Sequence, residues 1–388
     1  MSRRIATGID IGTHHTKIVV VEEVSGPEGS AIHIIGTGLA QSAGMHHGYV
    51  VDVEDVAASV RAAKHQAEQI AHVPIKKGFV AIGGVSLDEV RASGTTIISR
   101  ADQEITDLDV AKTRESAREA AAPNFLNRRV LHEIPLEYRV DGAKCLGEPY
   151  GLKGTRLEVD YLFITCLESH ENLLTHAIEA ADIEVIDRMA SPLAGSYVTL
   201  SKDQKMKGCV LANIGAETVS IVVYDEGVPM SVKVFPIGST NITDDLALGF
   251  KVSLEDAERL KIGRLGGSMY PRRKVEEVIA ARFRAMFELI DKHLKSLGRK
   301  GALPAGIVIS GGASGQGSIA DIAKGTLALP ARIADMKVSN DSKVRDATWA
   351  VAYGLALWGL TGDTETPKKH RFAGFGTSFE RFIKQFLP

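Results

Sequence analysis

The hydrophobic positions at the start of the chain predict two strands joined by a polar, glycine-containing bend. Residues 5–23 read IATGIDIGTHHTKIVVVEE, and apolar residues on both sides of the bend mark the strands. The same pattern returns at residues 208–226, GCVLANIGAETVSIVVYDE, with Asp10 matched by Asn213 and Gly12 by Gly215. Repetition of such a unit predicts two similar α/β halves.

Between the two hairpins the pattern changes from mixed α/β to mainly β. Residues 56–71 have the composition of a helix, and GFVAIGG at 78–84 is typical of a buried strand that ends in a glycine turn. We expect short strands at 94–99, 129–140 and 155–161 around one helix at 107–121, then a strand at 161–167 and helices that begin near residues 171 and 192. The β-rich part therefore looks like a separate insert.

The second half continues with two helices, a strand and a glycine turn. Residues 252–262 and 273–297 have helical patterns, and GIVISGGAS at 306–314 predicts a buried strand that opens onto a turn, with a helix from about Ser318. Residues 362–377 are rich in Gly, Thr, Pro and Lys, which is linker composition.

The last ten residues predict an amphipathic helix. One apolar stripe at i, i+3, i+4, i+7 and i+8 consists of Phe379, Phe382, Ile383, Phe386 and Leu387. The helix is too short to span a bilayer but suits the membrane interface, and the basic residues at 368–371 would attract anionic lipid. The alternative is a terminal helix that packs on its own protein or on a neighbour.

The composition is that of an ordinary globular protein and excludes several classes. Among 388 residues, 46 Lys and Arg stand against 48 Asp and Glu, so the net charge of −2 gives no basis for a general nucleic-acid binder. The three cysteines form no C-x-x-C pair, which argues against zinc and redox motifs and favours a reducing cytoplasm. The charged N-terminus has no apolar signal core, and the longest apolar stretch, 349–360, is about half of a membrane span.

Three glycine turns that follow strands are the candidate ligand-binding elements. They are DIGT at 10–13, NIGA at 213–216 and SGGA at 310–313. Glycine lets backbone N–H groups approach an anion closely, so two facing turns could hold a polyphosphate between them. One such turn is usually only structural, whereas three in duplicated order favour a phosphate ligand.

Charged side chains near these turns extend the candidate site. Asp10 could orient water around a magnesium ion, and Thr16 or Lys17 could approach the phosphates. Glu258 and Lys261 lie three residues apart on one helix face, where they could hold a ribose and a purine edge. The alternatives are a plain turn residue for Asp10 and an exposed ion pair for Glu258 and Lys261.

These features together resemble the actin/Hsp70/sugar-kinase superfamily and, within it, the FtsA family of bacterial actin-like cell-division proteins. The resemblance runs over nearly the whole chain and is sharpest at IGG (82–84), IT (105–106), VLHEIPLEYRVDG (130–142), LEVD (157–160), NIG (213–215), PIG (236–238) and ISGGA (309–313). It implies duplicated actin-like α/β domains on either side of a nucleotide cleft, with an FtsA-type insert subdomain.

The resemblance also implies a division of the chain. The expected parts are half 1 at 1–83 and 161–192 with 350–361 returning to it, the insert at 84–160, half 2 at 193–243 and 303–349, its second lobe at 244–302, a linker at 362–377 and a membrane-targeting helix at 378–388. The expected ligands are ATP and Mg²⁺. The expected contacts are with Asp10, Gly12, Thr13, Thr16, Lys17, Asn213, Gly215, Ala216, Thr218, Gly238, Glu258, Lys261, Gly311, Gly312 and Ala313.

The chain departs from the family in the second phosphate turn. The family usually has DIGGGT where residues 213–218 read NIGAET. Asn213 cannot act as the carboxylate that helps to place magnesium and water, and the side chains of Ala216 and Glu217 are expected to crowd the approach to phosphate, with Glu217 adding repulsion. We therefore expect ATP binding with at most very slow hydrolysis.

The resulting prediction is an actin-like protein that binds ATP, polymerises and tethers filaments of the division protein FtsZ, through their C-terminal tails, to the inner face of the cytoplasmic membrane. Arg272, Arg273, Arg282 and Arg284 in the second lobe could attract an acidic tail, or could simply belong to a solvated helix. Two alternatives stay open: a small-molecule kinase of the same superfamily, and the actin-like assembly protein of type IV pili.

Overall fold

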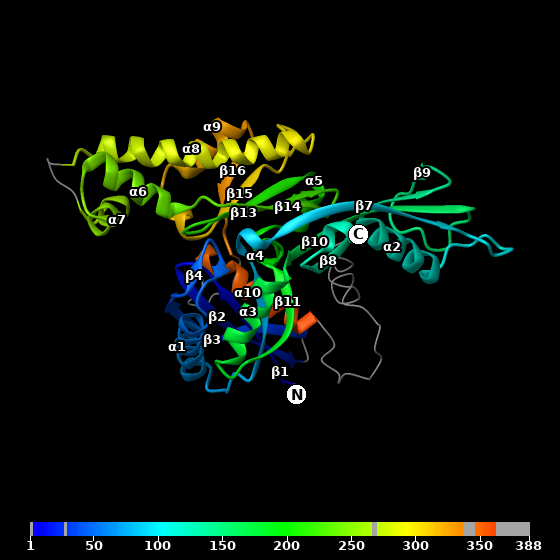
Figure 1. The fold of residues 1–388 in the computed structure, drawn as a ribbon, viewed down its shortest axis with the longest axis horizontal. Coiled ribbons are helices and arrows are strands. Elements are labelled where there is room, and N and C mark those ends of the chain that lie inside the picture. The colour runs from blue at the N-terminus through cyan, green and yellow to red at the C-terminus, as the bar shows by residue number, and fades with distance from the viewer. Residues whose placement is uncertain (1–2, 27–28, 266–269, 337–345, 362–388) are drawn as a thin grey trace.

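The computed structural model describes residues 3–26, 29–265, 270–336 and 346–361. In Figure 1 two α/β halves lie one above the other, and a third, β-rich body extends sideways from the boundary between them. The linker and the amphipathic helix expected at 362–388 lie outside the described residues.

The first half is a five-stranded sheet covered by helices on both faces. Its strand order is β11-β6-β1-β2-β3, in which β1 pairs antiparallel with β2 and parallel with β6. Its elements are β1 (Arg3–Ile11), β2 (His15–Gly26), β3 (Gly29–Gln41), α1 (Val53–Ala71), β6 (Lys77–Ile82), α3 (Glu168–Glu179), β11 (Glu184–Ala190), α4 (Ser191–Thr199) and α10 (Ala350–Thr361). Residues Ile18 to Val21 are fully buried because α1 and α10 both pack on β2.

The second half repeats this topology, as the duplicated hairpins predicted. Its order is β14-β13-β12-β15-β16, with an antiparallel hairpin β12–β13 followed by parallel neighbours. Its elements are α5 (Lys202–Lys207), β12 (Cys209–Ile214), β13 (Val219–Asp225), β14 (Val228–Phe235), α6 (Ser239–Phe250), α7 (Leu254–Lys261), α8 (Arg272–Ser296), β15 (Ile307–Ser310), η3 (Gly312–Gly315), α9 (Ile319–Leu327), β16 (Ala331–Ile333) and η4 (Ala347–Trp349).

The insert is a four-stranded antiparallel sheet with one helix against it. The order is β7-β10-β8-β9, and the elements are η1 (Gly84–Ser86), β7 (Asp88–Ile97), α2 (Asp107–Ala121), η2 (Ala122–Phe125), β8 (Arg128–Val140), β9 (Ala143–Lys144) and β10 (Arg156–Leu167). The strands predicted at 155–161 and 161–167 are one strand, so the boundary expected at residue 160 falls inside β10.

The two faces of β10 explain this correction. Val159, Tyr161 and Phe163 point into the insert's own core, whereas Leu162 and Ile164 belong to the large core of the first half. Side chains alternate along a strand, so one continuous strand serves both cores.

The sequence pattern did not predict helix α6 or the small hairpin of β4 (Met45–His46) and β5 (Tyr49–Val50). Helix α6 begins after Gly238, whose N–H donates to the Oδ1 of Asn241 at 3.0 Å, so a side chain inside the helix makes the capping contact. No helix in the described part of the chain is long and apolar enough to span a membrane.

Candidate functional site

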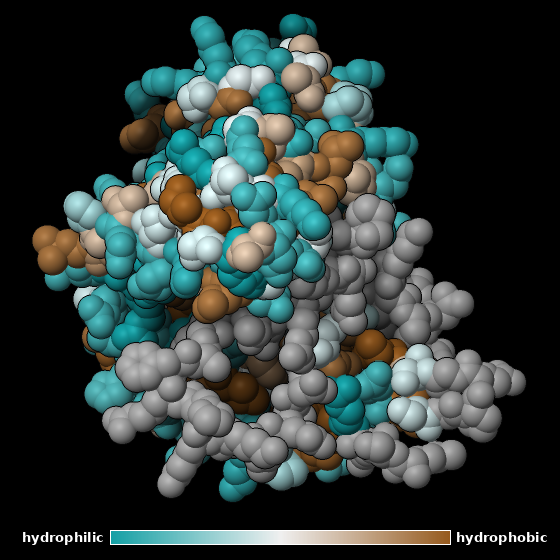
Figure 2. All heavy atoms as spheres, turned by 90° about the vertical axis from the view of Figure 1, so that its right-hand side faces the viewer, coloured by the Kyte–Doolittle hydropathy of each residue, from teal (hydrophilic) through white to brown (hydrophobic). Residues whose placement is uncertain are grey.

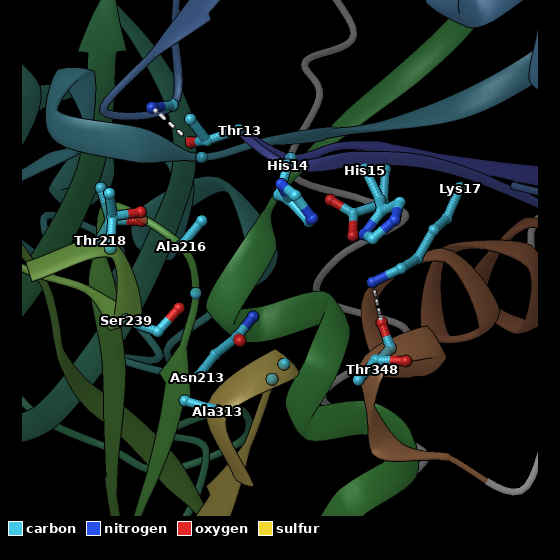
Figure 3. Close-up of a pocket in the computed structure, with 18 of the residues that line it drawn as sticks. Thr13, His14, His15, Lys17, Asn213, Ala216, Thr218, Ser239, Ala313 and Thr348 are labelled. Atoms are coloured by element: carbon cyan, nitrogen blue, oxygen red, sulfur yellow. Dashed lines mark hydrogen bonds between the residues drawn. The ribbon is translucent and has the colours of Figure 1, made fainter. Parts of the chain in front are cut away.

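A cavity of about 530 Å³ lies between the two halves, and the three predicted glycine turns line it (Figure 3). The structure brings together thirteen of the residues named from the sequence: Asp10, Gly12, Thr13, Lys17, Asn213, Gly215, Ala216, Thr218, Glu258, Lys261, Gly311, Gly312 and Ala313. These residues come from both halves, and the cavity is therefore a cleft between them.

Thr16 and Gly238 do not line the cleft. The hydroxyl of Thr16 is fully buried and lies 2.9 Å from the Oγ of Ser42, because side chains alternate along β2 and Lys17 takes the cleft side. At Gly238 an added Cβ would lie 2.2 Å from the backbone oxygen of Ala216. This glycine therefore packs directly against the backbone of the second turn.

The first and second turns have the same backbone geometry. The N–H of Gly12 donates to the carbonyl of His15 at 3.1 Å, and the N–H of Gly215 donates to that of Thr218 at 2.8 Å. The turns face each other across the cleft, which is the arrangement predicted from the repeat (Figure 3).

Asp10 and Lys17 are neighbours of opposite charge on paired strands, and both line the cleft. Burial raises the pKa of Asp10, partly offset by Lys17, and burial lowers the pKa of Lys17, partly offset by Asp10 and Asp346. The Nζ of Lys17 donates to the carbonyl of Thr348 at 2.7 Å (Figure 3). Lys17 is therefore held by η4, the segment directly before α10.

Glu217 does not crowd the cleft, contrary to the expectation from the sequence. Its carboxylate accepts a hydrogen bond from the N–H of His47 at 2.5 Å and lies 3.3 Å from the Nδ1 of His46. Both histidines belong to the β4–β5 hairpin of the first half. The sequence carried no signal for this contact because the hairpin itself was not predicted.

The third turn requires glycine at its second position, Gly311. Gly311 has φ 90°, and an added Cβ would lie 2.3 Å from the Oδ1 of Asn213. At Gly312 an added Cβ meets no described atom within 4 Å, so this residue faces open space in the cleft.

Glu258 and Lys261 sit at the far end of the cleft as a connected pair. The Nζ of Lys261 lies 2.6 Å from Glu258 Oε2 and donates to the hydroxyl of Thr243 at 2.8 Å. Burial tends to raise the pKa of Glu258, but hydrogen bonds from Lys261 and Thr243 outweigh it and lower the pKa. Lys261 is only 9% exposed, whereas Glu258 is 47% exposed, so one member of the pair is buried and the other faces solvent.

Several lining residues were not predicted: Ser239, Thr240, Gln316, Asp346 and Thr348. The N–H groups of Ser239 and Thr240 open helix α6 and donate to the carbonyls of Gly215 and Ala216 at 2.9 and 2.8 Å. The start of α6 thus fixes the second turn. A helix prediction over 239–250 would have revealed these two residues.

The cleft offers few protein side chains that could bind a metal ion. The described residues contain no cluster of three or more His, Cys, Asp or Glu side chains placed to hold a metal. Asp10, the one residue that the sequence assigned to magnesium, has Lys17 as its charged neighbour. A cation at this place would therefore need oxygen atoms from a bound phosphate ligand in addition to the carboxylate of Asp10.

Two family models match the chain, one described as "Cell division protein FtsA" over residues 210–354 and one as "SHS2 domain inserted in FTSA" over residues 86–165. Similar curated proteins are named cell division protein FtsA. That of Bacillus subtilis is 29% identical over 375 residues, 91% of this chain and 83% of the relative, and that of Escherichia coli K12 is 29% identical over 402 residues, 95% and 94% of the two chains.

Two solved structures share the fold. The "PilM-PilN type IV pilus biogenesis complex" aligns with a TM-score of 0.70 at 17% identity, covering 92% of this chain and 99% of that one. The ethanolamine utilization protein EutJ from Carboxydothermus hydrogenoformans aligns with a TM-score of 0.55 at 15% identity, covering 92% and 91%. The fold is actin-like, with two RNase H-like domains and an SHS2 insert. Because one FtsA model matches the insert and another matches the second half, the chain belongs to the FtsA family of cell division proteins.

Proposed function

We propose that this protein binds ATP and Mg²⁺ in the cleft, polymerises, and tethers FtsZ filaments to the cytoplasmic face of the cell membrane. The observation that carries the proposal is the pair of matching glycine turns that face each other across the cleft. A cavity of about 530 Å³ is within the usual range of about 300–1,000 Å³ for small-molecule sites.

The polyphosphate would lie between the two turns. Backbone N–H groups near Gly12 and Gly215, with the hydroxyls of Thr13 and Thr218, are the donors on either side. The nucleoside would lie between the Glu258–Lys261 pair and the third turn at Gly312. Carboxylate, ammonium and open backbone match the hydroxyls and ring nitrogens of a purine nucleoside.

A magnesium ion would lie beside Asp10. Mg²⁺ prefers oxygen ligands and is usually held by one or two carboxylates together with phosphate oxygens and water. The buried Asp10 carboxylate has a raised pKa, so a further cation nearby would stabilise its charged form. When bound, the ion would neutralise phosphate charge, and Lys17 would approach the phosphates beside it.

Hydrolysis in this site should be very slow. In phosphoryl transfer most of the rate enhancement comes from electrostatic positioning of the reacting groups. Asn213 lies in the cleft at the place where a carboxylate would help to orient the attacking water, and an amide supplies no negative charge. ATP would then act as a ligand that holds the two halves together.

Polymerisation would use the two ends of the molecule. Leu146 and Leu126 of the insert are 99% and 78% exposed, and Leu248 and Leu254 of the second lobe are 79% and 60% exposed. Figure 2, which faces the insert end, shows apolar side chains in small groups among hydrophilic ones. Contacts between copies would therefore combine apolar and polar pairs.

An FtsZ tail on the second lobe would meet arginines that already have acidic neighbours. Arg282 forms two hydrogen bonds of 2.7 Å with Asp245, and Arg272 and Arg273 pair with Glu276 and Glu277. An acidic tail would have to compete with these carboxylates. The arginines thus give less support to this part of the proposal than their number in the sequence implied.

The experiment that tests the whole proposal is co-sedimentation with anionic vesicles. The full chain, cognate FtsZ and ATP with Mg²⁺ are mixed with the vesicles, and FtsZ in the pellet is measured. We expect intact FtsZ to pellet with the vesicles and the full chain. An FtsZ that lacks its C-terminal tail should stay in the supernatant. Equal pelleting of the two forms of FtsZ contradicts the tethering function.

A further inference from the structure

The β4–β5 hairpin of the first half reaches across the rim of the cleft to the second half. At its tip the N–H of His47 donates to Glu217 Oε2 at 2.5 Å, and the Nδ1 of His47 lies 3.1 Å from the backbone oxygen of Glu217. The Nδ1 of His46 is 3.3 Å from the same carboxylate. Three polar contacts therefore join the halves at one point.

The hairpin is firmly attached to the first half. Its two central residues, His47 and Gly48, have φ of 48° and 71°, the left-handed pair of a tight two-residue turn. The N–H of Gly48 donates to the hydroxyl of Thr13 at 3.2 Å, and the ring of Tyr49 stacks on that of His170 at 4.7 Å. The tip cannot follow Glu217 if the second half moves.

Glu217 is equally fixed in the second half. It lies within the turn closed by the Gly215 to Thr218 hydrogen bond, and the start of α6 supports that turn from behind. Its side chain is 23% exposed and that of His47 is 33% exposed, so the contact is partly shielded from water. A hydrogen bond to a charged acceptor in such a place is among the stronger ones.

Away from this bridge the two halves share a continuous apolar core. Leu211 and Val222 of the second half belong to the same core as Leu193 and Leu355 of the first half. Packed cores deform little, so relative motion of the halves would open the cleft at the rim, where the contacts are few and polar. The bridge is placed where it resists that opening.

We propose that Glu217 and the His46-His47 hairpin form a latch across the nucleotide cleft, which must release before a nucleotide can enter or leave. The proposal rests on the nucleotide-binding function proposed above and adds its regulation. It also gives Glu217, in the position where the family usually has glycine, a role in the rate of exchange. Thr13 connects the latch to the ligand, because its hydroxyl accepts from Gly48 and keeps its own proton for a phosphate oxygen.

The test compares Glu217→Ala with Glu255→Ala, a change at an exposed surface pair on α7. Association of a fluorescent ATP analogue and its dissociation into excess ATP are measured by stopped flow on the full chain. We expect Glu217→Ala to raise both rates about tenfold, as loss of one charged hydrogen bond would allow, and His46→Ala to raise them less. The Glu255→Ala rates should match those of the wild type.

A faster dissociation with an unchanged association rate overturns the latch, since a mere loss of ligand contacts gives that result. Amide hydrogen exchange at His47 provides a readout without nucleotide: we expect protection in the wild type and its loss in Glu217→Ala. If the wild type binds no nucleotide, the proposed function fails. The contact between His47 and Glu217 is then tested only by the protection of the His47 amide from hydrogen exchange. An unprotected His47 in the wild type overturns it.

Discussion

Asp10 and Lys17 occupy directly opposite positions in the β1–β2 hairpin, and each affects the other's pKa more than any other charged group does. Removal of Asp10 leaves Lys17 with Asp346 and the carbonyl of Thr348 as its remaining partners. For Asp10→Asn we expect a loss of about 1 kcal/mol in the free energy of unfolding, because a partly exposed charge pair contributes less than a fully buried one. Urea denaturation measures it, and the double variant with Lys17→Met should recover part of the loss. A double variant that is less stable than either single one contradicts this coupling.

Stability should fall in acid because of buried neutral histidines. Burial lowers the pKa of His132 to about 3, and its Nε2 accepts a hydrogen bond from the N–H of Ala190 at 3.0 Å. In the unfolded chain His132 binds a proton below about pH 6.5, whereas in the folded protein it stays neutral down to about pH 3. The stability present above pH 6.5 is therefore lost progressively as the pH falls toward 3.

The expected slope from His132 alone is about 1.4 kcal/mol per pH unit between pH 6 and 4. Urea denaturation at several pH values measures it. His132→Gln keeps a hydrogen-bond acceptor but does not titrate, so the variant should lose this part of the slope. An identical pH dependence in the two proteins would show that His132 is protonated when folded.

Gly312→Asp should weaken binding of ATP at least about tenfold. The position faces open space in the cleft, so the new side chain is accommodated, but its negative charge would lie near the ligand. Gly312→Ala is the matched control, since a methyl group meets no described atom within 4 Å, and it should bind nearly as the wild type does. Titration with a fluorescent ATP analogue measures both, and equal affinity of Gly312→Asp and wild type would falsify the placement.

Release of phosphate by the wild type on vesicles should stay far below about one per second, the low end of ordinary enzymes. Asn213→Asp should raise the turnover about tenfold, because it restores a carboxylate next to the second turn. The assay needs ATP, Mg²⁺ and purified protein. A wild type that already turns over near one per second refutes the role given to Asn213.

Phe382→Glu should detach most of the protein from anionic vesicles. Burial of one Phe side chain in an apolar medium contributes about 1.5–3 kcal/mol, and the new charge adds a penalty. Sedimentation with vesicles measures the bound fraction, with Gln385→Glu on the polar face of the helix predicted from the sequence as the control. If a chain that ends at Gly376 pellets as well as the intact one, the terminal helix is not the anchor.

Local pattern predicted the parts of the fold that are repeated or strongly periodic. The hairpin around Asp10 and its copy around Asn213 were found because strand, glycine turn and strand recur in the same order. Helix α2 runs over Asp107–Ala121 as predicted, because Thr106 supplies a capping box at its start. These signals depend on neighbouring residues alone.

Contacts between distant segments were beyond local pattern. Thr16 was expected in the cleft and turned to Ser42, and Glu217 was expected near phosphate and turned to His47. The direction of a side chain depends on which face of a strand the fold covers, and on a hairpin 170 positions away in the case of Glu217. Sequence proximity to a glycine turn was not enough to place either residue.

Strand β10 contributes to two cores, and this limits how the insert could be removed from the molecule. Leu162 and Ile164 fill the first half from the same strand whose Tyr161 and Phe163 fill the insert. Excision of the insert up to residue 160 would cut the strand in the middle and leave the first half with a frayed, unpaired remnant. The insert is therefore no detachable module, and it should unfold together with the first half in a single cooperative step.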